Sequence, residues 1–330
     1  MKSTKSPRVV FVIVGWNNRK LLADCFDSLA SQTYSELGVI YLDNNSSDGS
    51  AAWVRENYPD VTVVEPGDNT GFAKGNNLGI ALALEDPSVR YVGLLNTDAR
   101  LAPDWVERVV RFADTKPKGA CYQGTTLNYN DRGRIDSTHI FAARNGQGTQ
   151  GNWRSYAVHE LGPKKVFGVN AAACVISRSF IEAQPFRDQV FDEAMYMYLE
   201  DVDLAARSTV MGWDNYLVPG ARAYHMGSVS SKSIGSSFSL YMTFRNNSAM
   251  LYKNFPWRLL FKMTARVIRG DIDTIISLWQ ADRKKEIGSM LRGRLVGIIR
   301  IPLFMLKRFK VSRVRQVDSD YLWQLMKEGY

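Results

Sequence analysis

Cysteine is scarce in this chain of 330 residues: there are three, Cys25, Cys121 and Cys174, and they stand far apart. An odd number of widely spaced cysteines argues against a disulfide framework and against a cysteine zinc site. Such usage is typical of proteins of a reducing compartment. We therefore expect a cytoplasmic location.

Long hydrophobic runs are also missing. The chain starts with a polar stretch, MKSTKSPR, and the apolar run VVFVIVG is too short for a membrane span, so we expect neither a signal peptide nor a spanning helix here. The glycine-rich motifs G-x-G-x-x-G after the first strand and G-x-x-x-x-G-K-[ST] are absent as well. The sequence therefore lacks the best-known phosphate-binding signatures.

The composition, with 45% apolar and 23% charged residues, predicts a soluble globular protein with a full-sized core, in one large domain or two smaller ones. The net charge of +9 is unevenly placed. Residues 253–330 hold 17 Lys and Arg against 7 Asp and Glu, whereas residues 1–252 hold 25 against 26. This asymmetry predicts an anionic partner for the C-terminal segment and not for the body of the protein.

The first 113 residues alternate between continuous apolar runs, typical of buried strands, and stretches with helical spacing. We expect strands at 9–15, 38–43, 61–65 and 91–96, and helices at 21–31, 50–58, 72–84 and 103–113. Strand–helix–strand units of this size predict a parallel, doubly wound sheet, hence an α/β fold.

The rest of the chain is less regular. Residues 120–165 are rich in Gly and Asn and predict a loop or hairpin region. We expect further strands at 166–169, 213–218 and 221–225, a short helix before residue 185 and a helix at 201–211, with mostly helical structure from residue 239 onward.

Polar residues follow each of the four predicted N-terminal strands. They are Trp16-Asn17-Asn18, the run from Asp43 to Gly49, the run from Gly67 to Gly71, and Asn96-Thr97-Asp98. Loops are polar in general, so one such cluster carries little weight. Because ligands of such sheets bind beyond the carboxyl ends of the strands, four clusters on one edge predict a ligand site there.

Asp98 follows a strand directly, and Asn96 accompanies it. Carboxylate, phosphate and water oxygens are the ligands of Mg²⁺ and Mn²⁺, so Asp98 is a candidate metal ligand. His225, one of three histidines, also stands at a strand end. A lone histidine is more often structural than a ligand, but this position favours a ligand role.

Three carboxylates, Glu200, Asp201 and Asp203, crowd the start of the helix predicted at 201–211. Acids in a first turn stabilise a helix by capping and by its dipole, and that interpretation fits this stretch alone as well as a catalytic one does. Together with Asp98 and His225 the acids could form a metal site and a base, but the sequence does not show that they meet.

Seven motifs occur in order over residues 8–255. They are VVFVIVGWN, LLADCFDSLASQTY, VIYLDNNSSDGS, DNTGFAKGNNLGIALAL, YVGLLNTDARLAPDW, FDEAMYMYLEDVDLAARSTVMGW, and PGARAYHMGSVS with YMTFRNN downstream. On these motifs the chain resembles the family 2 inverting glycosyltransferases, especially their bacterial rhamnosyltransferase-like branch. Each motif alone would be modest evidence, and their order makes the resemblance specific.

The resemblance implies a GT-A fold, which is Rossmann-like with a mostly parallel central sheet flanked by helices. It implies a catalytic domain at 1–252, with a nucleotide-sugar half at about 1–118 and an acceptor half at about 119–252. A basic amphipathic helical extension would follow at 253–330. The implied reaction moves a sugar, first choice L-rhamnose from dTDP-L-rhamnose, onto a hydroxyl of a glycan or lipid-linked glycan in cell-surface polysaccharide synthesis. UDP-galactofuranose and UDP-N-acetylglucosamine remain open as donors.

The resemblance also assigns roles to single residues. Asp201 would be the catalytic base, Glu200 would orient the acceptor and Asp203 would be a helix cap. Asp98 and His225 would bind Mn²⁺ or Mg²⁺, with Asn96-Thr97-Asp98 in place of the D-x-D motif. The expected nucleotide-sugar contacts are Asp43, which would read the base, together with Asn17, Asn45, Ser46, Asn69, Gly71, Phe72, Asn76, Asn77, Asn96 and Arg245. Arg245 would touch the diphosphate, the alternative being a plain surface arginine.

The sequence departs mildly from the family pattern. Thr97 stands where a proline is commoner, and Trp16 stands where a tyrosine often follows the strand. Two rival functions are a nucleotide-sugar-binding protein without catalysis and a nucleotidyltransferase on a similar sheet. Nucleotidyltransferases usually carry a glycine-rich, basic loop after the first strand, where this chain has GWNN.

In residues 255–316, apolar residues at helical spacing are interleaved with Arg and Lys. This pattern predicts interfacial helices that bind an anionic membrane surface, at the inner face of the cell membrane. Arg300 and Pro302 interrupt the longest apolar stretch, so we expect no membrane span. The alternatives are a helical cap over the catalytic domain and a contact in a homo-oligomer. Nucleic acid is not expected, because no binding motif accompanies the basic residues.

Overall fold

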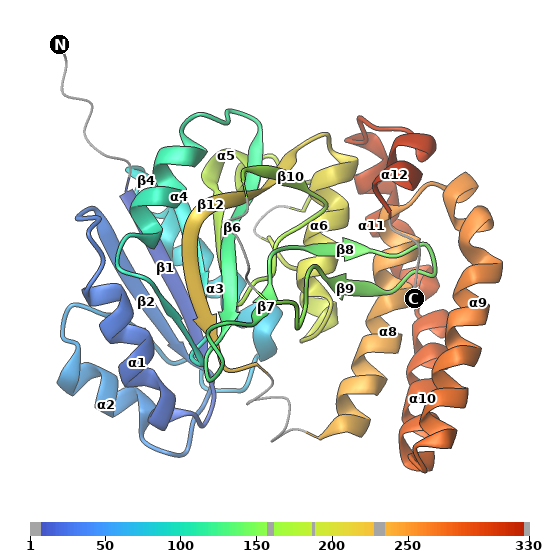
Figure 1. Cartoon of the computed structure of the whole chain (residues 1–330), viewed down its shortest axis with the longest axis horizontal. Helices are drawn as coiled ribbons and strands as arrows, with labels where there is room; N and C mark the ends of the chain where they lie inside the picture. Colours follow the sequence, from blue (N-terminus) through green and yellow to red (C-terminus); the bar gives the residue numbers. More distant parts are fainter. Residues whose placement is uncertain (1–7, 157–161, 187–188, 228–234, 327–330) are drawn as a thin grey trace.

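A computed structural model of the chain describes residues 8–156, 162–186, 189–227 and 235–326. A central sheet of ten strands is flanked by helices, and a further group of helices, α8 to α12, lies to the right of the sheet in Figure 1. The predicted α/β class is therefore confirmed. The strand order is β10-β12-β6-β11-β4-β1-β2-β3, with β5 beside β12 and β7 beside β6.

The N-terminal part follows the predicted alternation, with boundaries within two residues of those expected. Its strands are β1 (Arg8–Gly15), β2 (Leu37–Asp43), β3 (Thr62–Val64) and β4 (Val89–Leu95), and its helices are α1 (Arg19–Ala30), α2 (Ser50–Asn57), α3 (Gly71–Leu84) and α4 (Trp105–Ala113). These four strands are mutually parallel. Gly15, the last residue of β1, pairs with Asp43, the last residue of β2, so these loops leave the sheet at one edge.

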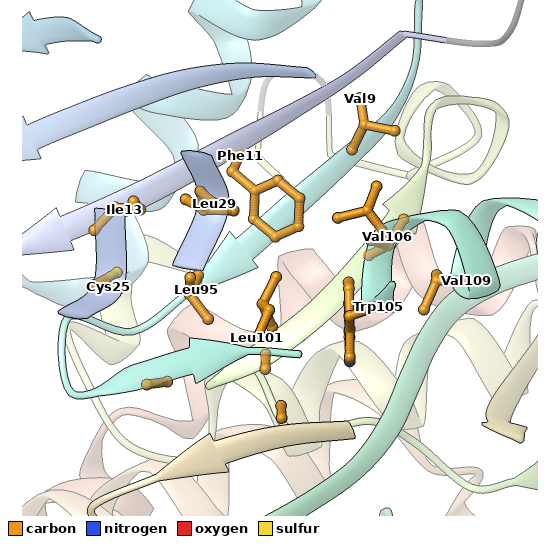
Figure 2. Close-up of a cluster of buried hydrophobic side chains, with 14 of the residues drawn as sticks. Val9, Phe11, Ile13, Cys25, Leu29, Leu95, Leu101, Trp105, Val106 and Val109 are labelled. Carbon is orange, nitrogen blue, oxygen red and sulfur yellow. The ribbon is translucent and has the colours of Figure 1, made fainter. Parts of the chain in front are cut away.

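Strand β1 is buried on both sides because its residues alternate between two cores. Val9, Phe11 and Ile13 face a core that α1 and α4 complete. In Figure 2 the ring of Phe11 lies near Trp105 of α4, and their centroids are 6.1 Å apart. Val10 and Val12 face the opposite core, toward α3. A continuous apolar run is therefore what this central strand requires.

The second half of the sheet is mixed and departs from the expected, mostly parallel arrangement. Its strands are β5 (Ala99–Leu101), β6 (Gly119–Asn128), β7 (Ile135–Ser137), β10 (Lys164–Val166), β11 (Ala173–Ser177) and β12 (Asp214–His225), and β8 (Ile140–Ala142) and β9 (Gly148–Gln150) form a separate hairpin. Strand β11 runs antiparallel to both β4 and β6 and joins the two halves.

Several predictions for this half were wrong in detail. The region 120–165 contains a core strand, β6, besides the expected hairpin, and the strand expected at 166–169 lies at 164–166. The two strands expected at 213–218 and 221–225 are one strand, β12, whose pairing with β6 shifts register between Leu217 and Arg222. Pro219 and Gly220 at this shift made one strand resemble two.

The remaining helices cover the acid-rich segment and form the C-terminal layer. They are α5 (Arg178–Glu182), the 3₁₀ helix η1 (Glu193–Met195), α6 (Glu200–Val210), α8 (Ser236–Asn254), α9 (Trp257–Gln280), α10 (Lys284–Ile299), α11 (Ile301–Arg313) and α12 (Ser319–Leu325). Helices α6, α8, α9, α11 and α12 share one hydrophobic core. The expected boundary between residues 252 and 253 lies inside α8. No helix in the described part of the chain is both long and apolar enough to cross a membrane.

Candidate active site

The loops that follow β1, β2 and β4 are tied together by side-chain hydrogen bonds. Asn17, in a left-handed conformation with φ of 51°, donates its backbone N–H to Ser46 Oγ at 2.9 Å and accepts from the backbone N–H of Ser47 at 2.7 Å. The side-chain amide of Asn18 donates to Thr97 Oγ1. The prediction that the polar clusters gather at one sheet edge is therefore confirmed.

Asn44, which the sequence did not single out, joins the β2 and β3 loops. Its Nδ2 donates to Asn69 Oδ1 at 3.0 Å and to the Gly71 carbonyl at 3.2 Å, and its Oδ1 accepts from the Thr70 N–H at 2.7 Å. The next residue, Asn45, is left-handed with φ of 64°. Asn44 thus positions two of the predicted sugar-nucleotide residues, and its only sequence signal is its place in the DNN run.

Asp43 is buried at the end of β2. One carboxylate oxygen accepts from the Ser46 N–H at 2.7 Å, while Oδ2 is buried and has no hydrogen-bond partner among the described residues. Leaving a buried acceptor unsatisfied costs about 1–3 kcal/mol. The free oxygen fits a ligand that brings an N–H donor, as the ring N–H of uracil or thymine would.

The polar residues of α3 turn inward. Asn77 accepts from the Phe191 N–H at 2.9 Å and donates to the Phe191 carbonyl at 2.8 Å, and Asn76 donates to the Phe72 carbonyl at 2.9 Å. Phe72 lies against Phe191, with ring centroids 6.0 Å apart. Asn77 and Phe72 thus fasten the helix to the segment before α6, whereas the bond of Asn76 lies within α3. Direct contact of these residues with a sugar nucleotide stays a prediction.

Asp98 and His225 are brought together by the sheet. Strand β5 begins directly after Asp98 and runs antiparallel to the end of β12, so that Ala99 pairs with His225. His225 Nε2 lies 3.3 Å from Asp98 Oδ1, and His225 Nδ1 lies 2.9 Å from Asp136 Oδ2. Asp136 sits on β7, in the region expected to be loop or hairpin, and no motif marks it.

The three side chains form a buried charged group. Burial alone would lower the pKa of His225, but the hydrogen bonds and negative charges of Asp136 and Asp98 outweigh it and raise the pKa to about 10. The imidazole therefore carries a proton when no metal is bound. A carboxylate that holds the second nitrogen of a metal-binding histidine is a recurrent arrangement, and Asp136 has that place.

Within the described residues, no group of three or more His, Cys, Asp or Glu side chains could hold a metal ion. The protein thus offers two candidate ligands that face each other, Asp98 and His225. Mg²⁺ and Mn²⁺ accept water and phosphate oxygens for their other positions, so this donor set fits an ion that is bound together with a diphosphate. Asn96 is partly exposed beside Asp98, and its backbone N–H donates to the Ala172 carbonyl at 2.9 Å.

Asp203 does not cap α6 as expected. It is fully buried, with Oδ2 2.9 Å from Lys253 Nζ and 3.2 Å from an Arg207 nitrogen. Its Oδ1 accepts from the Asn254 side chain at 2.7 Å. The cap prediction was wrong because two of the three partners of this carboxylate, Lys253 and Asn254, come from α8, which the local helix pattern does not include.

Asp201 and Glu200 differ in their surroundings although they are neighbours. Asp201 is partly exposed and accepts hydrogen bonds from the backbone N–H groups of Val202, at 2.8 Å, and of Ala171. Burial raises the pKa of Asp201 to about 6. Glu200 is buried, with one carboxyl oxygen lacking a partner among the described residues. Burial and the charge of Asp201 raise the pKa of Glu200 to about 8. At neutral pH the pair therefore offers one ionised and one protonated carboxyl group.

The acid pair adjoins the strand-end loops. Ala171 donates to Asp201, and the next residue, Ala172, accepts from the Asn96 N–H, two residues before Asp98. On the other side, the hydroxyl of Tyr196 donates to Asn69 Oδ1 at 3.0 Å. A carboxylate suited to take a proton thus lies beside the edge that carries the candidate metal ligands.

Arg245 of α8 contacts η1, the short helix that precedes the acid pair. Its guanidinium donates to the carbonyls of Ala194, at 3.1 Å, and Met195, at 2.8 Å. These bonds occupy the arginine with protein backbone, so it is not a plain surface arginine. Its expected contact with a diphosphate stays a prediction.

The sequence profile described as glycosyl transferase family 2 matches residues 10–182. The chain belongs to glycosyl transferase family 2. The chain is similar over most of its length to an N-acetylglucosaminyl-diphospho-decaprenol L-rhamnosyltransferase of Mycobacterium tuberculosis. The two are 24% identical over 78% of this chain and 90% of the relative. A low-salt glycan biosynthesis hexosyltransferase, Agl10 of Haloferax volcanii, is 22% identical over 74% of this chain and 75% of its own length.

Two solved structures share the fold of this family 2 glycosyltransferase. The mannosyltransferase PcManGT of Pyrobaculum calidifontis, solved with GDP-Man and Mn²⁺, has a TM-score of 0.52 at 16% identity and covers 91% of this chain and 88% of its own. GalNAc-T7, solved with UDP, GalNAc and Mn²⁺, has a TM-score of 0.58 at 12% identity over 76% of this chain, but the match spans only 48% of that structure. The fold is GT-A, as the motifs implied.

Proposed function

We propose that this glycosyltransferase is an inverting, metal-dependent hexosyltransferase that transfers L-rhamnose from dTDP-L-rhamnose to a hydroxyl of a lipid-linked glycan during cell-surface polysaccharide synthesis. The observation that carries the proposal is the position of the partly exposed Asp201 carboxylate, in the first turn of α6 and beside the strand-end loops. The choice of sugar and acceptor rests on the mycobacterial relative, whose name specifies an L-rhamnosyltransferase and a diphospho-decaprenol acceptor.

The residues suggest the following chemistry. Asp201 takes the proton of the acceptor hydroxyl as that oxygen forms a bond to C1 of the sugar. The bond from C1 to the diphosphate oxygen breaks on the opposite side, and the nucleoside diphosphate leaves. Base catalysis of this kind is typically worth about 10²–10⁴-fold in rate. Glu200, protonated at neutral pH, is able to donate a hydrogen bond to the acceptor and so orient it.

The leaving group develops negative charge on its diphosphate. Asp98 and His225 would hold a divalent ion there, with Asp136 fixing the imidazole. A bound Mn²⁺ or Mg²⁺ would supply charge neutralisation to the diphosphate. Asp43 would accept from the ring N–H of the base, a contact that suits thymine and uracil alike. UDP-galactofuranose and UDP-N-acetylglucosamine therefore stay as alternative donors.

Binding and transfer are measured separately to test the proposal. In a thermal-shift screen with and without Mn²⁺, we expect dTDP-L-rhamnose to raise the melting temperature more than UDP-galactofuranose or UDP-N-acetylglucosamine, because a ligand that binds only the folded state stabilises it. Transfer of labelled rhamnose to a lipid-linked glycan should follow. Binding without transfer or hydrolysis would favour a non-catalytic sugar-nucleotide-binding protein. No shift with any of the three donors would contradict the proposal.

Three helices of the C-terminal layer carry exposed large apolar side chains. The exposed large apolar residues follow helical spacing on three helices: Phe261, Ile268, Ile272, Ile276 and Trp279 on α9, Leu291, Leu295, Ile298 and Ile299 on α10, and Leu303, Leu306 and Phe309 on α11. We name this set the apolar outer face. Its helices belong to the segment with the excess of Lys and Arg.

We propose that the apolar outer face lies on an anionic membrane surface, peripheral at the cytoplasmic side. Amphipathic helices with apolar stripes and basic residues bind such interfaces, and each nearby cation adds about 1 kcal/mol of attraction. A lipid-linked acceptor would be met at the same surface. A contact between two copies of the chain is the alternative, and oligomeric state together with vesicle binding separates the two.

A further inference from the structure

The segment that leads into Asp201 has an unusual backbone. Tyr196, Tyr198 and Leu199 have positive φ angles of 63°, 69° and 65° although none is glycine. Tyr196, with ψ of −63°, forms the strained kind of γ-turn, closed by the Met197 N–H on the Met195 carbonyl at 2.7 Å. Each such residue costs on the order of 1–3 kcal/mol, so the surrounding structure has to hold the segment in place. We call residues 195–199 the left-handed segment.

The buried side chain of Asn246, on α8, holds the left-handed segment in place. Asn246 is 1% exposed, and its Nδ2 lies 2.9 Å from the Met195 carbonyl, 2.9 Å from the Met197 carbonyl and 2.8 Å from the Tyr198 carbonyl. A primary amide has two N–H bonds, and here both point at carbonyls of the left-handed segment. A single side chain therefore contacts the segment along most of its length.

Arg245 fixes the direction of that amide. Its Nε donates to Asn246 Oδ1 at 3.0 Å, which leaves the amide nitrogen turned toward the segment. The same guanidinium donates to the Met195 carbonyl at 2.8 Å. The two neighbouring residues thus act on the segment together.

The chain is also anchored on both sides of the left-handed segment. Before it, Asp192 pairs with Lys253 of α8 at 2.6 Å. After it, Asp203 pairs with the same Lys253 at 2.9 Å. Asp201 lies between these two anchors, so its position depends on how the left-handed segment is held.

We propose that Asn246 is a positioning residue of the active site: by binding the three carbonyls of the left-handed segment it fixes where α6 begins and thus where the Asp201 carboxylate lies. The catalytic part of this inference rests on the proposed function, whereas the structural part does not.

The decisive variant is Asn246→Asp, which keeps the size of the side chain but removes both N–H donors. The matched control is Asn247→Asp, the same substitution at the next residue of α8, whose side chain donates to the Gly146 carbonyl and accepts from Arg294 instead. Hydrogen–deuterium exchange is followed in peptides that cover residues 192–204. We expect exchange there to be about tenfold faster in Asn246→Asp than in the control at matched melting temperature, because local opening becomes easier. Unchanged exchange would overturn the proposal.

Kinetics test the positioning role. We expect kcat of Asn246→Asp to fall by about 10²-fold, the effect of misplacing a reacting group by roughly 1 Å, while KM for the sugar nucleotide stays within about twofold. Faster hydrogen exchange in residues 192–204 of Asn246→Asp, together with an unchanged kcat, would overturn the positioning role of Asn246. If the wild-type protein transfers no sugar, the proposed function fails, and the exchange comparison still decides whether Asn246 holds the segment.

A second variant covers the case in which Asn246→Asp does not fold. Arg245→Met removes the guanidinium that orients Asn246, and we expect the same loosening of residues 192–204 with a smaller loss of kcat. A rise in KM for the sugar nucleotide without looser exchange would place Arg245 at the diphosphate and contradict its part in the proposal.

Discussion

The Nε2 atom of His225 lies 3.3 Å from Oδ1 of Asp98, although 126 residues separate them in the sequence. Strand β5 explains the approach, because it starts one residue after Asp98 and pairs with the end of β12. The geometry carries a direct prediction about metal binding.

Asp98→Ala should abolish the Mn²⁺-dependent part of the thermal shift that dTDP produces. Asp136→Asn should have a smaller effect and lower the metal affinity by about 10–100-fold, because this substitution loosens the ligand His225 and does not remove a ligand. Isothermal titration of Mn²⁺ in the presence of dTDP measures both. Asp60→Ala, at an exposed position, serves as control. Equal metal affinity in Asp98→Ala and wild type would count against this site.

Asp201→Asn should keep the fold and the binding of the donor but lower turnover by about 10²–10⁴-fold, because the amide takes no proton from the acceptor. The melting temperature and the dTDP-L-rhamnose shift report fold and binding, and a transfer assay reports turnover. A variant that transferred sugar at nearly the wild-type rate would show that another group is the base.

The pH dependence of kcat should follow the acid pair. Because burial raises the pKa of Asp201 to about 6, the base is protonated and idle below that pH, and the rate should rise as pH increases through it. The rate should fall again near pH 8, where Glu200 loses its proton. Glu200→Gln should remove the fall at high pH and keep the rise. A profile flat from pH 5 to 7 would argue against Asp201.

Asp192→Asn should destabilise the protein by up to about 3–5 kcal/mol, because it removes one of the two carboxylates that neutralise the buried Lys253 and leaves only Asp203. Burial alone would raise the pKa of Asp192, but the charges of Lys253 and Lys307 hold that pKa well below its usual range, so the carboxylate is ionised at neutral pH. Urea unfolding gives the free energy. Glu107→Gln breaks the exposed pair with Arg111 and should change it by less than about 1 kcal/mol. If Asp192→Asn and Glu107→Gln changed the free energy of unfolding equally, burial of the Asp192–Lys253 pair would not matter for stability.

Phe261→Glu combined with Leu306→Glu should prevent flotation with vesicles of phosphatidylglycerol and phosphatidylcholine, because both side chains are more than three-quarters exposed on the apolar outer face. High salt should weaken wild-type flotation through the basic residues. Leu78→Glu, on α3, is the control. If the wild type sediments as a dimer and does not float, the outer face is a contact between copies.

The N-terminal half was largely predictable from sequence because its signals are local. Buried parallel strands such as β1 consist of uninterrupted apolar runs, and the helices between them carry apolar residues at helical spacing along one face. Both patterns can be recognised in the sequence. The candidate site residues on this half follow strands, which is why Asn17, Asp43 and Asp98 could be placed at one edge before the structure was known.

The second half was harder because its stabilising contacts are distant in sequence. Strand β6 contains Gly124 and polar residues such as Gln123, whose side chain is satisfied by Ser137 of β7, so the strand shows no apolar run. The role of Asp136 depends on its contact with His225, 89 residues away, and that of Asp203 on its contact with Lys253. A local pattern does not contain partners of this kind.

Helix α8 runs without a break across residue 252, and Lys253 and Asn254, its last two residues, complete the pairing of Asp192 and Asp203. Shortening the chain at residue 252 would remove Lys253, Asn254 and Lys307, so that Asp192 would lose both of its lysine partners and Asp203 would keep only Arg207. We therefore expect the catalytic domain and the helical extension to fold as one unit.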